Sequence, residues 1–252
     1  MDLAYDPRES LHYKIICIRH LTPPDGPDFE IEIFSSESGF WRICQGKNYN
    51  LPPGIQFQVG IYWKNSLHYL NPYSGVSCYF RIEDETLRSL PMPPMQSEVY
   101  TEKRSWYMGQ SGGHLHLVDI QKNIIRDPPI GIYELMDDYS GWELKFRVEL
   151  GLIGSKYPEM VHYIDVIQLV FPGEGDNSHR IGRYYTYTVL SVIQKEGEED
   201  FMEIVMSIPH KIICYNPRDN TSKVLVYFGD DNDRVGYEWN NVVQYTETLL
   251  PV

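Results

Sequence analysis

Two histidines have the spacing of a metal-binding pair. His114 and His116 stand two residues apart in "HLHLVDI", so a β-strand would direct both imidazoles to one face of its sheet. A zinc site needs three or four ligands, and no further residue is suggested by spacing. We therefore interpret both as structural histidines, like His68 in "SLHYL", and predict no metal and no cofactor.

Acidic residues gather in "GEEDFMEI" (197–204) and in "FGDDNDRVG" (228–236). The second stretch brings Asp230, Asp231 and Asp233 together, but it lacks the Gly and the Glu that an EF-hand calcium loop requires. We interpret it as an exposed hairpin tip. "GQSGGH" (109–114) precedes a strand and not a helix, so it lacks the helix N-terminus that holds a phosphate and is interpreted as a tight turn.

The sequence contains no nucleophile elbow, no P-loop and no HExxH motif. We predict no catalytic residues, and partner-binding residues are not identifiable from sequence. The five tryptophans are interpreted as core or inter-sheet packing, with Trp106 nearest to a rim because Lys103 and Arg104 precede it. Trp41 and Trp142 are predicted to occupy equivalent, largely buried places. The other three are Trp63, Trp106 and Trp239.

Composition restricts the class of partner. The 22 basic and 35 acidic residues give a net charge of −13, which disfavours nucleic acid and anionic membranes. No apolar run reaches the roughly 18 residues of a membrane helix, and the N-terminus does not resemble a signal peptide. We expect an intracellular protein, cytoplasmic or nuclear. Its four cysteines are expected to be buried and reduced. They are Cys17, Cys44, Cys78 and Cys214.

Side-chain polarity alternates with period 2 along most of the chain, which predicts strands. The expected strands are 13–20, 29–34, 55–63, 114–120, 144–150, 185–193 and 223–228. Turn clusters rich in Pro, Gly, Asn and Asp separate them. The best helical candidate is the short stretch 155–164, and we expect a single domain over 1–252 with an irregular part at 159–183.

Pieces of the sequence recur. "IEIFSSESGFWR" (31–42) matches "IGIYELMDDYSGWE" (130–143), and "CYFRIEDETLRSL" (78–90) matches "CYNPRDNTSKVL" (214–225). Hairpins that repeat a Gly and a Trp, with no crossover helices between them, are typical of β-propeller blades. A β-sandwich with coincidental tryptophans is the alternative, because sandwiches also use short strands at such spacing.

The ordered motifs resemble one family, the plant F-box-associated, kelch-like β-propellers. They include "LAYDPRESLHYKIICIR" (3–19), "GIYWKNSLHYL" (60–70), "YFRIEDETLRSLPMPP" (79–94), "YELMDDYSGWELKFRVEL" (133–150) and "YEWNNVVQYTETLLPV" (237–252). The resemblance implies an all-β fold of four-stranded antiparallel blades. Because the family's F-box and first propeller region do not precede "LAYDP", an incomplete ring is expected.

The resemblance also implies a function, that of a non-catalytic module that recognises a protein substrate for an F-box ubiquitin ligase. The ligase adaptor would be a partner only if an F-box were present in the full gene product, so this chain is not expected to bind the adaptor by itself. The alternative is a propeller enzyme, a hydrolase or lyase with a carboxylate and histidine site near the central channel. Three or more such groups converging in one pocket would favour the enzyme.

Overall fold

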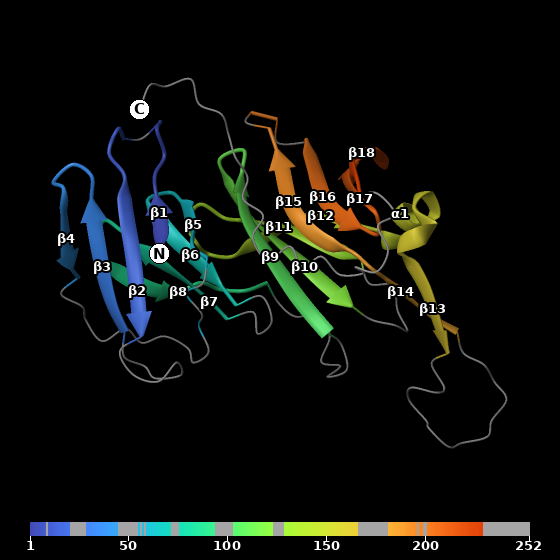
Figure 1. The fold of residues 1–252 in the computed structure, drawn as a ribbon, viewed down its shortest axis with the longest axis horizontal. Coiled ribbons are helices and arrows are strands. Elements are labelled where there is room, and N and C mark those ends of the chain that lie inside the picture. The colour runs from blue at the N-terminus through green and yellow to red at the C-terminus, as the bar shows by residue number, and fades with distance from the viewer. Residues whose placement is uncertain are drawn as a thin grey trace, which may run out of the picture.

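The computed structural model describes residues 1–8, 10–20, 29–44, 55, 57, 59–71, 76–93, 103–122, 129–165, 181–195, 197–198 and 201–228. Strands dominate these residues, and the fold is all-β, as predicted (Figure 1). Among the described residues, no helix is both long enough and apolar enough to cross a membrane.

Four antiparallel sheets of four strands follow one another, and in each sheet the strands pair in chain order. We call these sheets the first to fourth blades. The first blade contains β1 (Asp2–Ala4), β2 (Lys14–His20), β3 (Phe29–Ser35) and β4 (Phe40–Ile43). The second contains β5 (Ile61–Trp63), β6 (Ser66–Leu70), β7 (Ser77–Arg81) and β8 (Thr86–Ser89). The third contains β9 (Lys103–Ser111), β10 (His114–Lys122), β11 (Ile130–Leu135) and β12 (Trp142–Val148), and the fourth contains β15 (Thr188–Gln194), β16 (Met202–Ile208), β17 (Lys211–Asn216) and β18 (Thr221–Tyr227).

The blades stand side by side with their first strands innermost. β1 contacts β5, β5 contacts β9, and β9 contacts β15. The fourth strands β4, β12 and β18 lie outermost and are mostly exposed. Figure 1 shows this succession from the blue first blade to the orange fourth blade. Four-stranded meanders with their first strands inward are the architecture of a β-propeller. The expected incomplete ring stays a prediction.

The core lies between neighbouring blades. Ile16 and Ile33 of the first blade pack in one cluster with Phe80 of the second blade. Residues of the second and third blades share another cluster, which contains Trp63 and Leu117. A third cluster joins the third blade to the fourth. Each sheet is therefore stabilised chiefly by apolar contact with its neighbour.

A short irregular unit connects the third blade to the fourth. It comprises α1 (Leu150–Lys156), the 3₁₀ turn Pro158–Met160, and a two-stranded sheet of β13 (Val161–Asp165) and β14 (Ile181–Tyr185). Of the predicted helix over 155–164, only the first two residues belong to α1; Pro158–Met160 form a 3₁₀ turn and the stretch from Val161 is strand β13, so the prediction is wrong beyond Lys156. Tyr157 precedes a proline and is non-helical, with φ −128°, because proline disfavours helical geometry in the residue before it.

Two predicted strands are shorter than expected. In 55–63 only Ile61–Trp63 is a described strand, and the Gly60 N–H before it donates to the Asp2 carboxylate at 2.8 Å and not to the backbone of a neighbouring strand. The stretch 185–193 divides between the end of β14 and the start of β15. Residues 166–180, which include most of the polar loop noted in the sequence, lie outside the described residues.

The tryptophans do not all behave as predicted. Trp63 and Trp106 are 4% and 7% exposed, so the rim position suggested for Trp106 is wrong. Trp41 is 47% exposed, and its predicted burial is also wrong, because it lies on the outermost strand β4. Trp142 is half-buried at the matching place in the third blade, and Trp239 lies outside the described residues. All four cysteines are free, and all except the half-buried Cys17 are buried.

Candidate interaction site between the second and third blades

Every blade joins its third and fourth strands by the same kind of turn. A Ser or Asp side-chain oxygen accepts a hydrogen bond from the backbone N–H two residues later, and the residue between them has a positive φ. The four sets are Ser38–Gly39–Phe40, Asp84–Glu85–Thr86, Asp138–Tyr139–Ser140 and Asp219–Asn220–Thr221. Such turns favour Asp and Ser because their short side chains reach the nearby backbone. They explain physically why the sequence repeats.

The turn of the third blade differs from the others because its central residue is aromatic. Tyr139 has φ +61°, a left-handed conformation that bulky residues rarely adopt. Its ring stacks on Tyr79 of the second blade, with 4.4 Å between centroids, and on His68 at 5.7 Å. The turn is thereby anchored in the neighbouring blade, and contacts of this kind can compensate for local backbone strain.

His68 forms the base of this aromatic stack and is fully buried. Its Nδ1 lies 3.2 Å from the Ile61 carbonyl oxygen, and its Nε2 lies 3.0 Å from the Tyr139 hydroxyl oxygen. Burial lowers the pKa of His68 from 6.5 to about 4, so the ring is neutral at physiological pH. Burial also raises the pKa of Tyr139, which keeps its hydroxyl protonated.

Trp63 closes the other side of the junction. Its ring centroid lies 5.7 Å from that of Tyr139, and its Nε1–H donates to the Gly113 carbonyl in the third blade at 2.7 Å. The neighbouring Lys64 places its Nζ 4.8 Å from the Trp63 ring and 2.5 Å from the Asp137 carboxylate. The two blades are thus joined by packing, by a hydrogen bond and by an exposed ion pair.

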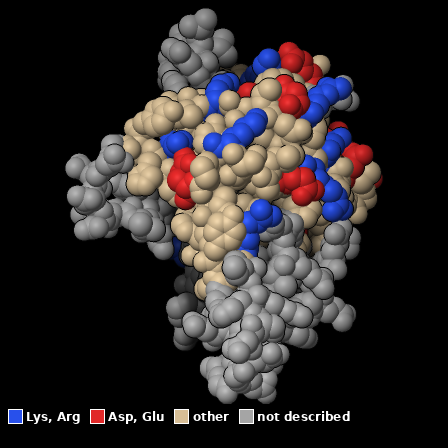
Figure 2. Space-filling view, turned by 90° about the vertical axis from the view of Figure 1, so that its right-hand side faces the viewer, with Lys and Arg blue, Asp and Glu red and all other residues tan. Residues whose placement is uncertain are grey.

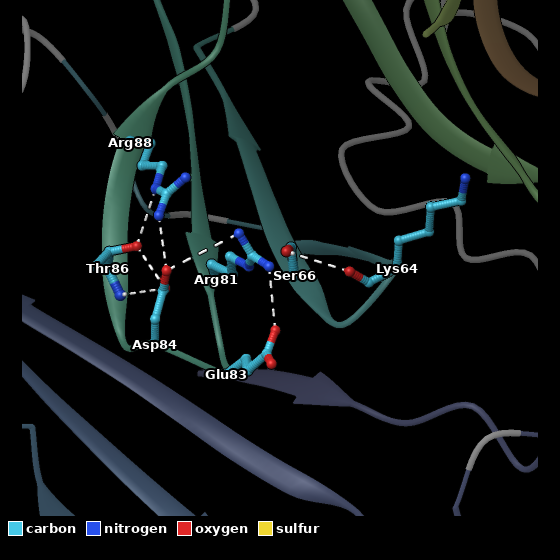
Figure 3. Close-up of polar contacts among 7 residues, drawn as sticks. All are labelled: Lys64, Ser66, Arg81, Glu83, Asp84, Thr86 and Arg88. Atoms are coloured by element: carbon cyan, nitrogen blue, oxygen red, sulfur yellow. Dashed lines mark hydrogen bonds and ion pairs between the residues drawn. The ribbon is translucent and has the colours of Figure 1, made fainter. Parts of the chain in front are cut away.

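A charged network lies beside this junction on the second blade (Figure 3). The Asp84 carboxylate stands between two guanidinium groups, 2.7 Å from Arg88 and 4.0 Å from Arg81. Arg81 also reaches Glu83 at 3.1 Å. A hydrogen bond from the Thr86 hydroxyl is the main cause of the lowered pKa of Asp84, so this carboxylate stays ionised below its usual range. The carboxylates of Asp84 and Glu83 are thus paired with the guanidinium groups of Arg81 and Arg88.

The surface of the junction is formed by the turn 136–141, which Tyr139 anchors in the second blade. Met136 is 48% exposed, and the Asp137 side chain is 75% exposed beside the half-buried Tyr139. The polar atoms of His68 and Tyr139 contact each other beneath this turn. A preorganised turn with an apolar and a charged side chain loses little conformational entropy on binding, so it suits recognition of a protein surface.

The two histidines considered as a metal-binding pair, His114 and His116, lie elsewhere, on β10. The His114 Nδ1 contacts the Glu134 carboxylate at 2.9 Å, and its ring centroid is 6.3 Å from that of His116. His116 is fully buried, with its Nε2 3.2 Å from the Ser111 carbonyl oxygen. Within the described ranges, no group of three or more His, Cys, Asp or Glu side chains could hold a metal ion.

The other sequence candidates are separated from the junction, with one exception. In the acidic stretch 197–204, Glu198 lies 3.6 Å from Lys195 and Glu203 lies 3.4 Å from Lys223, both within the fourth blade. Asp230, Asp231 and Asp233 lie outside the described residues. The predicted turn in 109–114 is confirmed, with positive φ at Gly112 and Gly113. It contributes the carbonyl that Trp63 binds.

Sequence reasoning found two residues of the junction, His68 as a structural histidine and Trp63 as inter-sheet packing, and missed the others. Tyr79, Tyr139, Lys64 and Asp137 belong to no catalytic motif, and they are far apart in the sequence. The recurring Asp-x-Thr and Asp-x-Ser of the turns was the available signal. In the first blade the central residue of this turn is Gly39, and in the third blade it is Tyr139. The large aromatic residue at this position marks the turn of the third blade as the one that contacts the second blade.

Charge does not single out another site on the face drawn in Figure 2. Lys and Arg side chains alternate there with Asp and Glu over the described surface, without a large area of one sign. One ion pair on the fourth-blade side links Lys211 to Glu159 at 2.5 Å. Both side chains of this pair are largely buried, at 18% and 28% exposed, so the pair does not form a charged surface.

Comparison with known proteins gives one sequence relative. No family model matches the chain. The F-box protein At5g07610 of Arabidopsis thaliana is 24% identical over 268 residues, in an alignment that covers 100% of this chain and 59% of that protein. The chain therefore spans about three fifths of the length of this relative. The likeness agrees with the F-box resemblance of the motifs.

Among solved structures, prolyl oligopeptidase B from Galerina marginata, bound to a macrocyclization substrate, is similar at 12% identity. The match covers 86% of this chain and 34% of that chain, with a TM-score of 0.28. A likeness of this size carries no conclusion about the fold or the activity of the present chain.

Proposed function

We propose that this protein is a non-catalytic interaction module that recognises a protein substrate, as the propeller of a plant F-box ubiquitin-ligase receptor does. Two findings support the proposal. The chain aligns along its whole length with an F-box protein. Its consecutive blades present hairpin turns at one end, where loops of a rigid scaffold commonly bind partners.

One observation carries the choice of site. The turn at 136–141 exposes Met136 and Asp137 while Tyr139 anchors it in the second blade. A partner that contacts this turn would meet an apolar side chain and a carboxylate at fixed positions. We therefore propose that the turn contributes to substrate binding, together with Lys64 and the charged network around Asp84.

The experiment compares partners captured in plant cells by proximity labelling. The test variant combines Met136→Glu with Asp137→Lys, which changes the exposed side chains and keeps Asp138 and Tyr139. The matched control is Glu37→Lys, because Glu37 takes the place of Asp137 in the equivalent turn of the first blade. We expect the labelling of specific partners by the test variant to fall at least tenfold. The control should label them as strongly as the unchanged protein.

Equal labelling by the test variant and the control would contradict this site, provided that both melt like the unchanged protein in circular dichroism. The function itself would be contradicted if the unchanged protein enriched no partner over the labelling enzyme expressed alone. Adaptor binding is a separate matter. The expectation that this chain does not bind the adaptor by itself stays a prediction, and a pull-down with purified adaptor measures it.

A further inference from the structure

The β9–β10 turn, meaning residues 111–113, contacts the blades on both sides of its own. On one side the Gly113 carbonyl accepts the Nε1–H of Trp63 in the second blade at 2.7 Å. On the other side the Ser111 hydroxyl bonds twice to the backbone of Gln194, the last residue of β15 in the fourth blade. One short turn therefore connects the candidate interaction site with the fourth blade.

The contact with the fourth blade uses backbone groups that no strand pairs with. β15 is an edge strand of its sheet, so one row of its N–H and C=O groups lacks a strand partner. The Gln194 N–H donates to the Ser111 Oγ at 3.0 Å, and the Ser111 hydroxyl donates to the Gln194 carbonyl at 3.4 Å. Both residues are buried, and a buried backbone group without a hydrogen bond is costly, which favours the docked turn.

Two further residues fix the turn against the fourth blade. Gly112 has φ +62°, and a Cβ built on it would lie 2.9 Å from the Gln194 carbonyl oxygen, so only glycine permits this approach. The fully buried His116 places its Nε2 3.2 Å from the Ser111 carbonyl oxygen. A carbonyl oxygen can only accept, so the imidazole is the donor to the turn. The position of the turn thus depends on the fourth blade and on the strand below it.

Trp63 relates the position of the turn to the candidate interaction site. Its buried ring lies 5.7 Å from the Tyr139 ring, measured between centroids. The neighbouring Lys64 places its Nζ 4.8 Å from the Trp63 ring and forms the ion pair with Asp137. A displacement of residues 111–113 would remove the acceptor of the Trp63 Nε1–H or draw the ring along with it. Either change would alter the packing that anchors the turn 136–141.

We propose that Ser111 and Gly112 are positioning residues for the interaction site, and that the fourth blade fixes the geometry of the turn 136–141 through them. The inference rests on the proposed function for the role of that turn, whereas the coupling itself needs no bound partner. Any event that separates residues 111–113 from Gln194 would loosen the site. Coupling between two contacts is reciprocal, so loss of the Trp63 hydrogen bond should in turn loosen the contact with Gln194.

The experiment measures hydrogen exchange of single amides by NMR on the 252-residue chain at pH 7.5. The reporters are the Met136 N–H, which donates to the Gly141 carbonyl, and the Tyr139 N–H, which donates to the Met136 carbonyl. Both amides belong to the turn 136–141, and neither contacts residues 111–113 directly through a printed hydrogen bond of the turn. Amides of β2 and β3 in the first blade serve as the reference for global stability, since local and global opening differ in free energy.

The test variant is Gly112→Ala, which places a methyl group against the Gln194 carbonyl. The matched control is Gly197→Ala, because Gly197 also has a positive φ, +79°, and a Cβ there meets no atom within 4 Å. Both variants therefore carry the backbone strain of a left-handed alanine, and only the first disturbs the contact between blades. We expect exchange of the two reporters to accelerate at least tenfold in Gly112→Ala and less than twofold in the control.

A second pair of variants remains valid if Gly112→Ala does not fold. Ser111→Ala removes both hydrogen bonds to Gln194 and adds no volume. Its control is Ser191→Ala, which removes another buried hydroxyl of the fourth blade, one that donates to the Val192 carbonyl. The reporters should accelerate at least tenfold in Ser111→Ala and keep their rates in Ser191→Ala.

Reciprocity gives a measurement in the opposite direction. Trp63→Phe keeps an aromatic ring and removes the donor to the Gly113 carbonyl. The Gln194 N–H, which donates to the Ser111 Oγ, should then exchange at least tenfold faster. A purely local role of Ser111 within the contact of the third and fourth blades would leave this rate unchanged.

Unchanged exchange of the reporters in both Gly112→Ala and Ser111→Ala would overturn the proposal. Equal acceleration in a test variant and its control, or equal acceleration across β2 and β3, would indicate general destabilisation and would overturn it as well. The proposed function is judged separately, by partner labelling. If the unchanged protein captured no partner while the reporters responded, the function would be contradicted and the coupling would stand.

Discussion

The turns of the first and third blades have the same backbone and opposite surroundings. Gly39 and Tyr139 both have positive φ, +74° and +61°. A Cβ on Gly39 would meet no atom within 4 Å, whereas the Tyr139 ring stacks on two residues of the second blade. Trp41 follows the first turn and is 47% exposed, while Trp142 follows the third and is half-buried.

This contrast shows that the repeated sequence specifies the turn and not its packing. The turn requires a left-handed residue, which glycine adopts without strain and other residues adopt at a cost of about 1–2 kcal/mol. The third blade accepts that cost at Tyr139, where stacking and the contact with His68 offset it. The first blade has no such neighbour on the outward side of its turn, among the described residues.

The largest expected effect tests whether the two tryptophan environments differ. Trp63→Ala should lower the free energy of unfolding by about 3–5 kcal/mol, because it removes a buried aromatic ring and leaves the Gly113 carbonyl without that donor. Trp41→Ala should lower it by less than about 1 kcal/mol in the monomer, because the ring is half exposed. Urea melts of both variants at submicromolar concentration measure the difference. Equal losses would contradict the contrast between the buried junction and the exposed strand β4.

The next effect is pH dependence from the buried histidines. Burial lowers the pKa of His68 and of His116 from 6.5 to about 4. Between pH 6.5 and 4 the histidines are protonated in the unfolded chain and neutral in the native state. Their contribution to the free energy of unfolding is therefore complete above pH 6.5 and is lost as the pH falls from 6.5 towards 4. Each histidine should account for about 3 kcal/mol over that range.

Urea melts between pH 7.5 and 4.5 measure this loss. His68→Gln should flatten the pH profile relative to the unchanged chain, and His116→Gln gives a second case if the first variant does not fold. His12→Gln is the control, because His12 is exposed. A profile that keeps its slope in both buried-histidine variants would show that other groups cause the loss.

Sequence reasoning found the parts of this fold that depend on local pattern. The period-2 runs gave most strands, and the repeated hairpins gave the blade architecture, because alternation and turn chemistry are written within ten or so residues. It failed where the burial of a residue depends on the neighbouring sheet. Trp41 was predicted to be buried between sheets, as the equivalent of Trp142 in a repeated unit, but only the sheet order shows that β4 is outermost.

The assembly of the candidate site was missed for the same reason, although His68 was interpreted as a structural histidine. His68, Tyr79 and Tyr139 come from three separate strands and turns, and no spacing links them. Tyr139 looks like an ordinary turn residue until its positive φ and its ring contacts are seen. His114 and His116 attracted attention because they are close in sequence, yet they bind different partners. A site between two blades combines residues that are far apart in the sequence, so only the folded structure reveals it.

A smaller effect separates the Tyr139 hydroxyl from its ring. Tyr139→Phe keeps the stack on Tyr79 and removes the hydrogen bond with His68 Nε2. The loss should be about 1–1.5 kcal/mol, the typical net value of one hydrogen bond, with the buried nitrogen left without this partner. Thermal melts at pH 7.5 measure it. Tyr163→Phe, at a site 71% exposed, should change nothing, and an equal shift there would indicate a general effect of removing a tyrosine hydroxyl.

The smallest effect isolates backbone strain at the first turn. Gly39 has φ +74°, and a Cβ built there meets open space, so a substitution is penalised only through the backbone. Gly39→Ala should therefore cost about 1 kcal/mol, and Gly39→Asn should cost less, because asparagine enters the left-handed region more readily. Denaturant melts resolve the order of the three proteins, glycine above asparagine above alanine. Equal stability of the alanine variant and the unchanged chain would mean that this turn relaxes to another conformation, and the equivalence with the strained turn at Tyr139 would then not hold.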